Sequence, residues 1–168
     1  MFIRALYLIL IFISFLNGIS FDVDDWFIVK KLGEIKSITE DYYSIHFLAE
    51  NGIFSYDKSS GNIDLNLELH SNEYTPQILH YDENSDYYWL IARNKIFVKS
   101  SVSSYWNELY NYNLNIPSGN ITNIGSSSSY VWLEIGFSVY PVYGNGTKIS
   151  DNEEINSNEI DFIEWSSY

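Results

Sequence analysis

The chain has 168 residues, and its 9 basic and 22 acidic side chains give a formal net charge of −13 at pH 7, which argues against a nucleic-acid partner. It contains no cysteine, so disulfides, thiolate metal ligands and cysteine nucleophiles are excluded together. Aromatic residues make up 18% of the sequence, and this composition predicts an all-β fold with almost no helix after Ser20.

The N-terminal segment has the pattern of a secretory signal peptide. Arg4 is followed by an apolar stretch from Ala5 to Leu16. A helix of that length rises only about 18 Å, whereas the hydrocarbon core of a bilayer is about 30 Å thick. The stretch is therefore too short for a membrane span, and it predicts export of the rest of the chain to the periplasm, the cell surface or the medium.

Small side chains mark the expected cleavage site. Gly18 and Ser20 have the spacing that a signal peptidase requires, so we expect residues 1–20 to be removed and the mature chain to begin at Phe21. The alternative is an uncleaved membrane anchor, lengthened by Phe2 and Ile3. After cleavage, the sequence predicts no membrane span.

A repeat of 43 residues follows, with copies that start near residues 35, 78 and 121 and a partial copy near residue 160. Eight columns of mostly apolar or aromatic residues align without a gap over the three full copies. Four of these columns are Ile35, Ile78 and Ile121; Ile45, Tyr88 and Val131; His46, Trp89 and Trp132; and Phe54, Phe97 and Tyr140. We expect Trp89 and Trp132 to occupy equivalent buried positions.

Each copy predicts four short strands separated by turns. In the first copy the expected strands are Ile35–Glu40, Ile45–Glu50, Ile53–Tyr56 and Ile63–Leu69, with Asn51-Gly52 as a two-residue hairpin turn. The second strand of a copy is nearly apolar on both faces, which is typical of a strand inside a stack of sheets. Four strands in about 43 residues fit one blade of a β-propeller.

The predicted domain therefore covers residues 21–168 as an incomplete β-propeller of about three four-stranded blades. Asp25–Lys31 precedes the first copy and is expected to be a lone strand of the kind that completes a last blade. Glu159–Tyr168 is expected to begin the fourth copy, since Ile160 and Ile163 repeat the spacing of the first copy.

The first copy resembles the two-component-regulator propeller repeat. The resemblance lies in Ile35–Asp41, which has an Ile-x-x-Ile-x-x-Asp pattern, and in Ile45–Asp57, which has an Asn-Gly hairpin and a Tyr-Asp ending. The later copies depart from it, with Lys95 and Ser138 in place of the hairpin glycine. Such repeats occur in bacterial sensor regions, cell-surface proteins and secretion machinery, so the resemblance implies an exported binding scaffold with no particular chemistry.

The acidic segments do not form a complete metal-binding pattern. Asp82–Asp86 has oxygen ligands at alternate positions, like the start of a calcium loop, but its twelfth position is Arg93 rather than glutamate. We therefore expect a polar turn there, and a solvated segment at Asp22, Asp24 and Asp25. No cofactor and no metal ligand is predicted.

The histidines and serines do not predict a catalytic site. His46, His70 and His80 are scattered, and His46 lies in the tryptophan column, where we expect a core side chain with a satisfied ring nitrogen. Ser126–Ser129 lacks a paired histidine and acid in the sequence and is interpreted as a flexible turn. Catalytic residues are therefore predicted to be absent.

The sequence supports three functional hypotheses. The first is a non-catalytic exported scaffold that binds a protein or a glycan through the loops at the ends of its blades. The second is the N-terminal part of a propeller enzyme that acts on glycans. The third is the start of a longer reading frame, because three blades and a fraction cannot close a ring of four to eight blades. Uncovered end blades predict self-association or missing blades.

Overall fold

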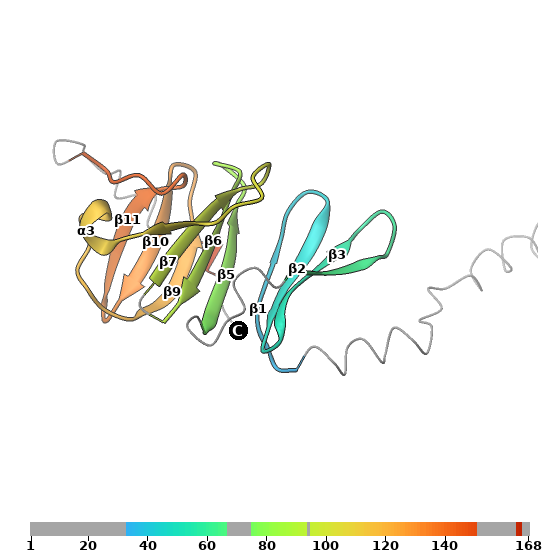
Figure 1. The fold of residues 1–168 in the computed structure, drawn as a ribbon. Coiled ribbons are helices and arrows are strands. Elements are labelled where there is room, and N and C mark those ends of the chain that lie inside the picture. The colour runs from blue at the N-terminus through green and yellow to red at the C-terminus, as the bar shows by residue number, and fades with distance from the viewer. Residues whose placement is uncertain (1–32, 67–74, 94, 151–163, 166–168) are drawn as a thin grey trace, which may run out of the picture. The chain divides into compact units, whose positions relative to one another are not determined.

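The computed structural model describes residues 33–66, 75–93, 95–150 and 164–165 (Figure 1). The chain divides into two compact units, Met1–Lys31 and Leu32–Tyr168, and every described residue belongs to the second. The predicted signal peptide, the predicted strand Asp25–Lys31 and His70 lie outside the described residues. Within the described part of the chain, no helix is long and apolar enough to cross a membrane.

The described fold is all-β, as predicted, and consists of three antiparallel sheets. The first has the order β1-β2-β3-β4, with β1 (Ile35–Glu40), β2 (Ser44–Ala49), β3 (Gly52–Asp57) and β4 (Ile63–Asn66). The second has the order β5-β6-β7-β8, with β5 (Pro76–Asp82), β6 (Tyr87–Ala92), β7 (Lys95–Ser100) and β8 (Asn107–Leu109). The third has the order β11-β10-β9-β12, with β9 (Ile121–Ser126), β10 (Tyr130–Ile135), β11 (Ser138–Tyr143) and β12 (Glu164–Trp165). The short helix α3 (Asn111–Leu114) lies between β8 and β9.

The strands recur with the predicted period. β2, β6 and β10 begin at residues 44, 87 and 130, and β3, β7 and β11 begin at residues 52, 95 and 138, so both series are spaced by 43 residues. Trp89 and Trp132 occupy the third position of β6 and β10, with 0% and 2% of their surface exposed. The predicted register and the burial of both tryptophans are therefore confirmed.

The first hairpin turn is displaced by one residue from the prediction. Ala49 pairs with Gly52, so Glu50 and Asn51 make the turn and Gly52 is already the first residue of β3. Gly52 has a φ of 145°, which is a conformation that favours glycine. The glycine is therefore needed just after the turn rather than inside it.

In the later copies, the residue with a positive φ lies at a different position of the hairpin. In the second copy Arg93 has a φ of 55°, and in the third copy Gly136 has a φ of 65°. The turn is therefore made before Lys95 and Ser138, which begin β7 and β11 as ordinary strand residues. This explains why those two positions do not require glycine.

The third sheet differs from the other two in its fourth strand. β4 and β8 pair with the third strand of their sheets, but β12 pairs with β9, with Glu164 opposite Ser126 and Trp165 opposite Gly125. The two described residues of the predicted fourth copy thus extend the third sheet, rather than lying in a sheet of their own.

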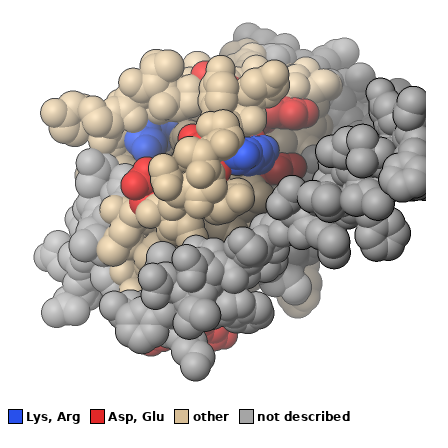
Figure 2. Space-filling view, turned by 90° about the vertical axis from the view of Figure 1, so that its right-hand side faces the viewer, with Lys and Arg blue, Asp and Glu red and all other residues tan. Residues whose placement is uncertain are grey.

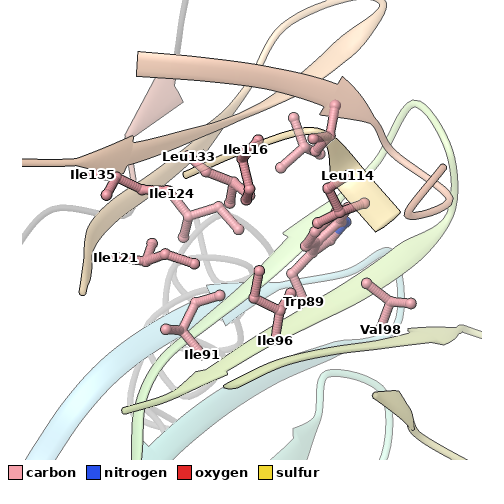
Figure 3. Packing of buried hydrophobic residues seen from close by; sticks show 12 residues of the cluster. Trp89, Ile91, Ile96, Val98, Leu114, Ile116, Ile121, Ile124, Leu133 and Ile135 are labelled. Atoms are coloured by element: carbon pink, nitrogen blue, oxygen red, sulfur yellow. The ribbon is translucent and has the colours of Figure 1, made fainter. Parts of the chain in front are cut away.

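The second sheet is buried on both faces, as its apolar sequence predicts. One face contributes Leu79, Leu90 and Phe97 to a cluster with Leu48 and Ile53 of the first sheet. The other face belongs to the largest described core, shared with the third sheet (Figure 3). Residues of that core include Trp89, Ile91, Ile96, Ile124, Val131 and Leu133.

Side chains join the first strands of neighbouring sheets. The Ser37 hydroxyl donates to the carbonyl of Leu79 and accepts its N–H, both at 2.8 Å, and Thr39 Oγ1 accepts the N–H of Tyr81 at 3.0 Å. His80 of β5 then contacts Ser126 of β9, with 2.6 Å between Nε2 and Oγ. The strands β1, β5 and β9 therefore follow one another as the contacting first strands of successive sheets.

Candidate functional site

One end of the first sheet and one end of the second sheet each bring two loops together. In the first sheet the N–H of Lys58 donates to the carbonyl of Tyr43 at 2.9 Å, and in the second the N–H of Ser101 donates to the carbonyl of Asp86 at 3.0 Å. These bonds join the loop after the first strand to the loop after the third strand. We call this the turn end of the sheets, and the candidate site lies there.

An open hollow of about 530 Å³ lies between the turn ends of the second and third sheets. The second sheet contributes Ser85 and Tyr87, and the third contributes Ser129, Tyr143, Gly144, Asn145 and Thr147. The lining has hydroxyl, amide and aromatic groups but no Asp, Glu, Lys or Arg. A lining without charged side chains, in a chain of charge −13, suits an uncharged ligand surface.

The wall of the hollow depends on a close approach at Gly144. A Cβ at this position would lie 2.1 Å from Asp82 Oδ2 and 2.2 Å from Ser85 Oγ, so only glycine fits. The carbonyl of Gly144 accepts the indole N–H of Trp89 at 2.9 Å, which holds the third sheet's loop against the second sheet. Trp89 thus links the predicted core column to the candidate site.

Asp82 lies behind this wall and is only 2% exposed. Its Oδ2 accepts the Ser85 hydroxyl at 2.5 Å, while its Oδ1 has no hydrogen-bond partner among the described residues. The Ser85 proton is therefore directed to Asp82, and its oxygen is left to accept from a ligand. The sequence pattern predicted a polar turn here but did not indicate the burial of Asp82.

Asn145 of the third sheet also lines the hollow, to which the second sheet contributes Ser85. Its Oδ1 accepts the N–H of Thr147 at 3.1 Å and the Thr147 hydroxyl at 2.7 Å. Asn145 is exposed, and the lining of the hollow combines its amide group with the hydroxyl groups of Ser85 and Thr147. Neutral donors and acceptors in this mixture match the hydroxyl groups of a glycan or the amides of a peptide.

Two other side chains of the Asp82–Asp86 segment, Asn84 and Asp86, hold loops together. Asp86 accepts the Tyr81 hydroxyl at 2.8 Å and the Ser101 hydroxyl at 2.5 Å. The amide of Asn84 donates to the carbonyl of Ser127 at 2.9 Å, which joins the second and third sheets. No group of three or more His, Asp or Glu side chains in the described part of the chain is placed to hold a metal ion.

A second polar cluster lies between the first and second sheets and consists of Asp41, His46, Ser55 and Tyr88; we call it the Asp41 cluster. His46 Nδ1 lies 2.7 Å from Ser55 Oγ, and His46 Nε2 lies 2.9 Å from Asp41 Oδ2. The Tyr88 hydroxyl donates to the same carboxylate oxygen and lies 3.1 Å from His46 Nε2. Both ring nitrogens of His46 have partners, as predicted, and its side chain is 12% exposed.

The charges in the Asp41 cluster are fixed by hydrogen bonds. Burial opposes ionisation of Asp41, but donors from Tyr88, His46 and the backbone of Ser44 and Tyr43 outweigh it and hold its pKa below the usual range. Burial and the adjacent Asp41 carboxylate raise the pKa of Tyr88. The cluster therefore contains an ionised carboxylate and a protonated tyrosine at neutral pH.

The serine run is not simply a flexible turn. Ser126 is the last residue of β9 and contacts His80, while Ser127 is only 6% exposed and its Oγ accepts the indole N–H of Trp132 at 3.0 Å. Ser127 and Trp132 occupy the same repeat positions as Asp41 and His46, so this hydrogen bond is equivalent to the one between His46 and Asp41. The prediction for Ser126–Ser129 was therefore wrong for its first two residues.

His80 is a buried histidine between the second and third sheets. Burial lowers its pKa to about 4, although the charge of Asp82 acts in the opposite direction. His80 is therefore neutral at pH 7. Its role is to join two sheets, which the sequence interpretation of scattered histidines did not identify.

The charged groups on the face shown in Figure 2 lie interspersed rather than in single-sign patches. An exposed ion pair joins Lys58 and Glu40 at 3.1 Å. Mixed exposed pairs contribute little to stability and do not mark a nucleic-acid surface.

No protein-family model matches the chain, and no curated protein sequence matches it significantly.

Proposed function

We propose that the chain is a non-catalytic, exported binding scaffold built from the first blades of a β-propeller. The observation that carries this proposal is the way in which successive sheets pack. The same repeat position faces the following sheet each time, because His46 contacts Tyr88 of the second sheet and Trp89 contacts Gly144 of the third. Blades of a propeller pack in such a series, with their first strands adjacent.

The binding surface in this proposal is the turn end of the sheets. Binding and catalytic residues concentrate on loops that a rigid scaffold positions, and the hollow between Ser85 and Asn145 is formed by such loops. Its neutral donors and acceptors favour a glycan or a protein segment over a charged ligand. No nucleic acid, cofactor or metal ion is required.

A binding experiment with the exported chain tests this function. The chain is applied to immobilised glycans and to surface-protein fragments, and the hollow is altered by Asn145→Ala. We expect binding that Asn145→Ala weakens at least tenfold. A matched control is Ser59→Ala, since Ser59 belongs to an exposed loop of the first sheet. Equal binding by all three proteins would contradict a site in the hollow.

The competing hypothesis is a propeller enzyme that acts on glycans. It predicts cleavage products from the same glycan panel. Turnover by the purified chain would favour this alternative, whereas binding without products supports the scaffold. Mass analysis of the glycans after incubation distinguishes the two results.

A further inference from the structure

Ser55 and His46 face each other directly across the β2–β3 ladder. Ser55 Oγ lies 2.7 Å from His46 Nδ1, which is hydrogen-bonding distance. Because both residues lie within paired strands, the sheet itself fixes their separation. Sites built on strands hold their geometry better than sites on loops.

Asp41 determines which ring nitrogen of His46 carries the proton. Asp41 Oδ1 accepts the N–H groups of Tyr43 and Ser44 at 2.7 and 2.6 Å, and Oδ2 lies 2.9 Å from His46 Nε2. A carboxylate only accepts hydrogen bonds, so Nε2 of the neutral ring is protonated and Nδ1 has a lone pair. The Ser55 hydroxyl therefore donates its proton to Nδ1.

The same three groups form an activated nucleophile in many enzymes: a hydroxyl, an imidazole base and an acid that orients the base. The cluster also reaches the surface. Ser55 is half-buried, and the side chains of His46 and Asp41 are 12% and 14% exposed. An electrophile can therefore approach from the solvent side.

We propose that Ser55 is a nucleophilic serine that activated carboxylic esters acylate, with His46 as its general base and Asp41 as a positioning residue. Ser55 Oγ forms a bond to the ester carbonyl carbon while its proton moves to His46 Nδ1. The carbon–oxygen bond to the alcohol then breaks, and the alcohol leaves with that proton. The products are an ester of Ser55 and a free alcohol, with no change of oxidation state. A single acylation of this kind requires no catalytic turnover, so it is compatible with the proposed binding scaffold and adds a covalent reaction to it.

A second serine–histidine pair in the same fold provides an internal comparison. Ser126 Oγ lies 2.6 Å from His80 Nε2, but His80 is only 7% exposed and its pKa of about 4 makes it a weak base. Ser126 is therefore expected to react slowly. Selective reaction at Ser55 follows from the Asp41 contact and from access to solvent.

Labelling with a fluorophosphonate probe tests the proposal. The serine oxygen replaces fluoride at phosphorus, and the adduct is located by intact mass and peptide mapping. We expect one adduct, on Ser55, in the full chain and none in Ser55→Ala. His46→Gln should react at least tenfold more slowly. The matched control is Ser101→Ala, because Ser101 is also partly buried but its hydroxyl donates to a carboxylate, Asp86, at 2.5 Å.

Tryptophan fluorescence shows whether each variant is folded. If His46→Gln loses the native spectrum, the comparison of Ser55→Ala with Ser101→Ala decides the matter, since both remove only a hydroxyl. The proposal is overturned by the absence of an adduct on Ser55. Equal labelling of the wild-type chain and Ser55→Ala, or wild-type rates in a folded His46→Gln, would overturn it as well.

Discussion

The burial and the hydrogen bonds of several polar residues in this fold depend on contacts between neighbouring sheets. His80, Asp82 and Asp41 each lie where two sheets meet: His80 contacts Ser126, Asp82 lies against Gly144, and Asp41 accepts the Tyr88 hydroxyl. A buried polar group is costly unless it is hydrogen-bonded, so these junctions are sensitive to protonation and to truncation. Two predictions follow at this scale.

The first concerns pH and His80. Its pKa is about 4 in the folded chain and 6.5 in the absence of the fold, so between these values the unfolded state binds more protons. Stability from this group is therefore complete above pH 6.5 and is lost as the pH falls towards 4. We expect a loss of about 2 kcal/mol between pH 7 and pH 5. Urea unfolding at both pH values measures it.

The control for this prediction is His80→Gln, which removes the titrating group. The difference between the two pH values should shrink in this variant by most of that amount. An unchanged pH dependence in a folded His80→Gln would show that His80 does not carry the effect.

The second prediction concerns the tryptophan column. Trp89→Ala or Trp132→Ala should lower the free energy of unfolding by about 3 to 5 kcal/mol, because each ring is fully buried and would leave a cavity. Each variant also loses an indole hydrogen bond, to Gly144 or to Ser127. Chemical denaturation measures the change. Tyr42→Ala is the control, since Tyr42 is 84% exposed and should change stability by less than about 0.5 kcal/mol.

At the scale of elements, the hairpins show how equivalent turns are made from different residues. The second copy uses Arg93 at a φ of 55°, where the third copy uses Gly136 at 65°. A side chain at a positive φ is strained by contact between Cβ and the backbone, whereas glycine is not. Substitutions at Arg93 and Gly136 therefore test how a side chain at a positive φ affects stability.

Arg93→Gly should raise the free energy of unfolding by about 1 kcal/mol, and Gly136→Ala should lower it by a similar amount. Both positions are exposed turn residues, so packing changes little. Thermal or urea unfolding measures both variants. A loss of stability in Arg93→Gly would contradict the assignment of strain to this residue.

Strand positions were predictable because apolar periodicity and the 43-residue offset both constrain them. The first turn was misplaced by one residue, since the sequence does not show whether a glycine lies inside the turn or just after it. Ser55 was missed because its partner is defined by cross-strand register rather than by a local motif. The burial of Asp82 depends on Gly144, which is distant in the sequence, so a local reading of an acidic turn could not detect it.

At the scale of the whole described unit, the first sheet differs from the second. Ile38, Phe47, Phe54 and Leu65 form a row across β1–β4, on the face opposite Ser37 and Thr39. Ile38 and Leu65 in this row are 43% and 50% exposed, whereas the second sheet is packed on both faces. The first sheet therefore presents apolar side chains that a further blade would cover in the proposed propeller.

Sedimentation of the purified chain across a concentration series in about 0.15 M salt tests this account most directly. The net charge of −13 opposes association, but its repulsion is screened over about 8 Å at this ionic strength. Because the first sheet gains by burying its exposed apolar side chains, we predict self-association or aggregation that increases with concentration. A compact, stable monomer at tens of micromolar would contradict the account of an open series of blades.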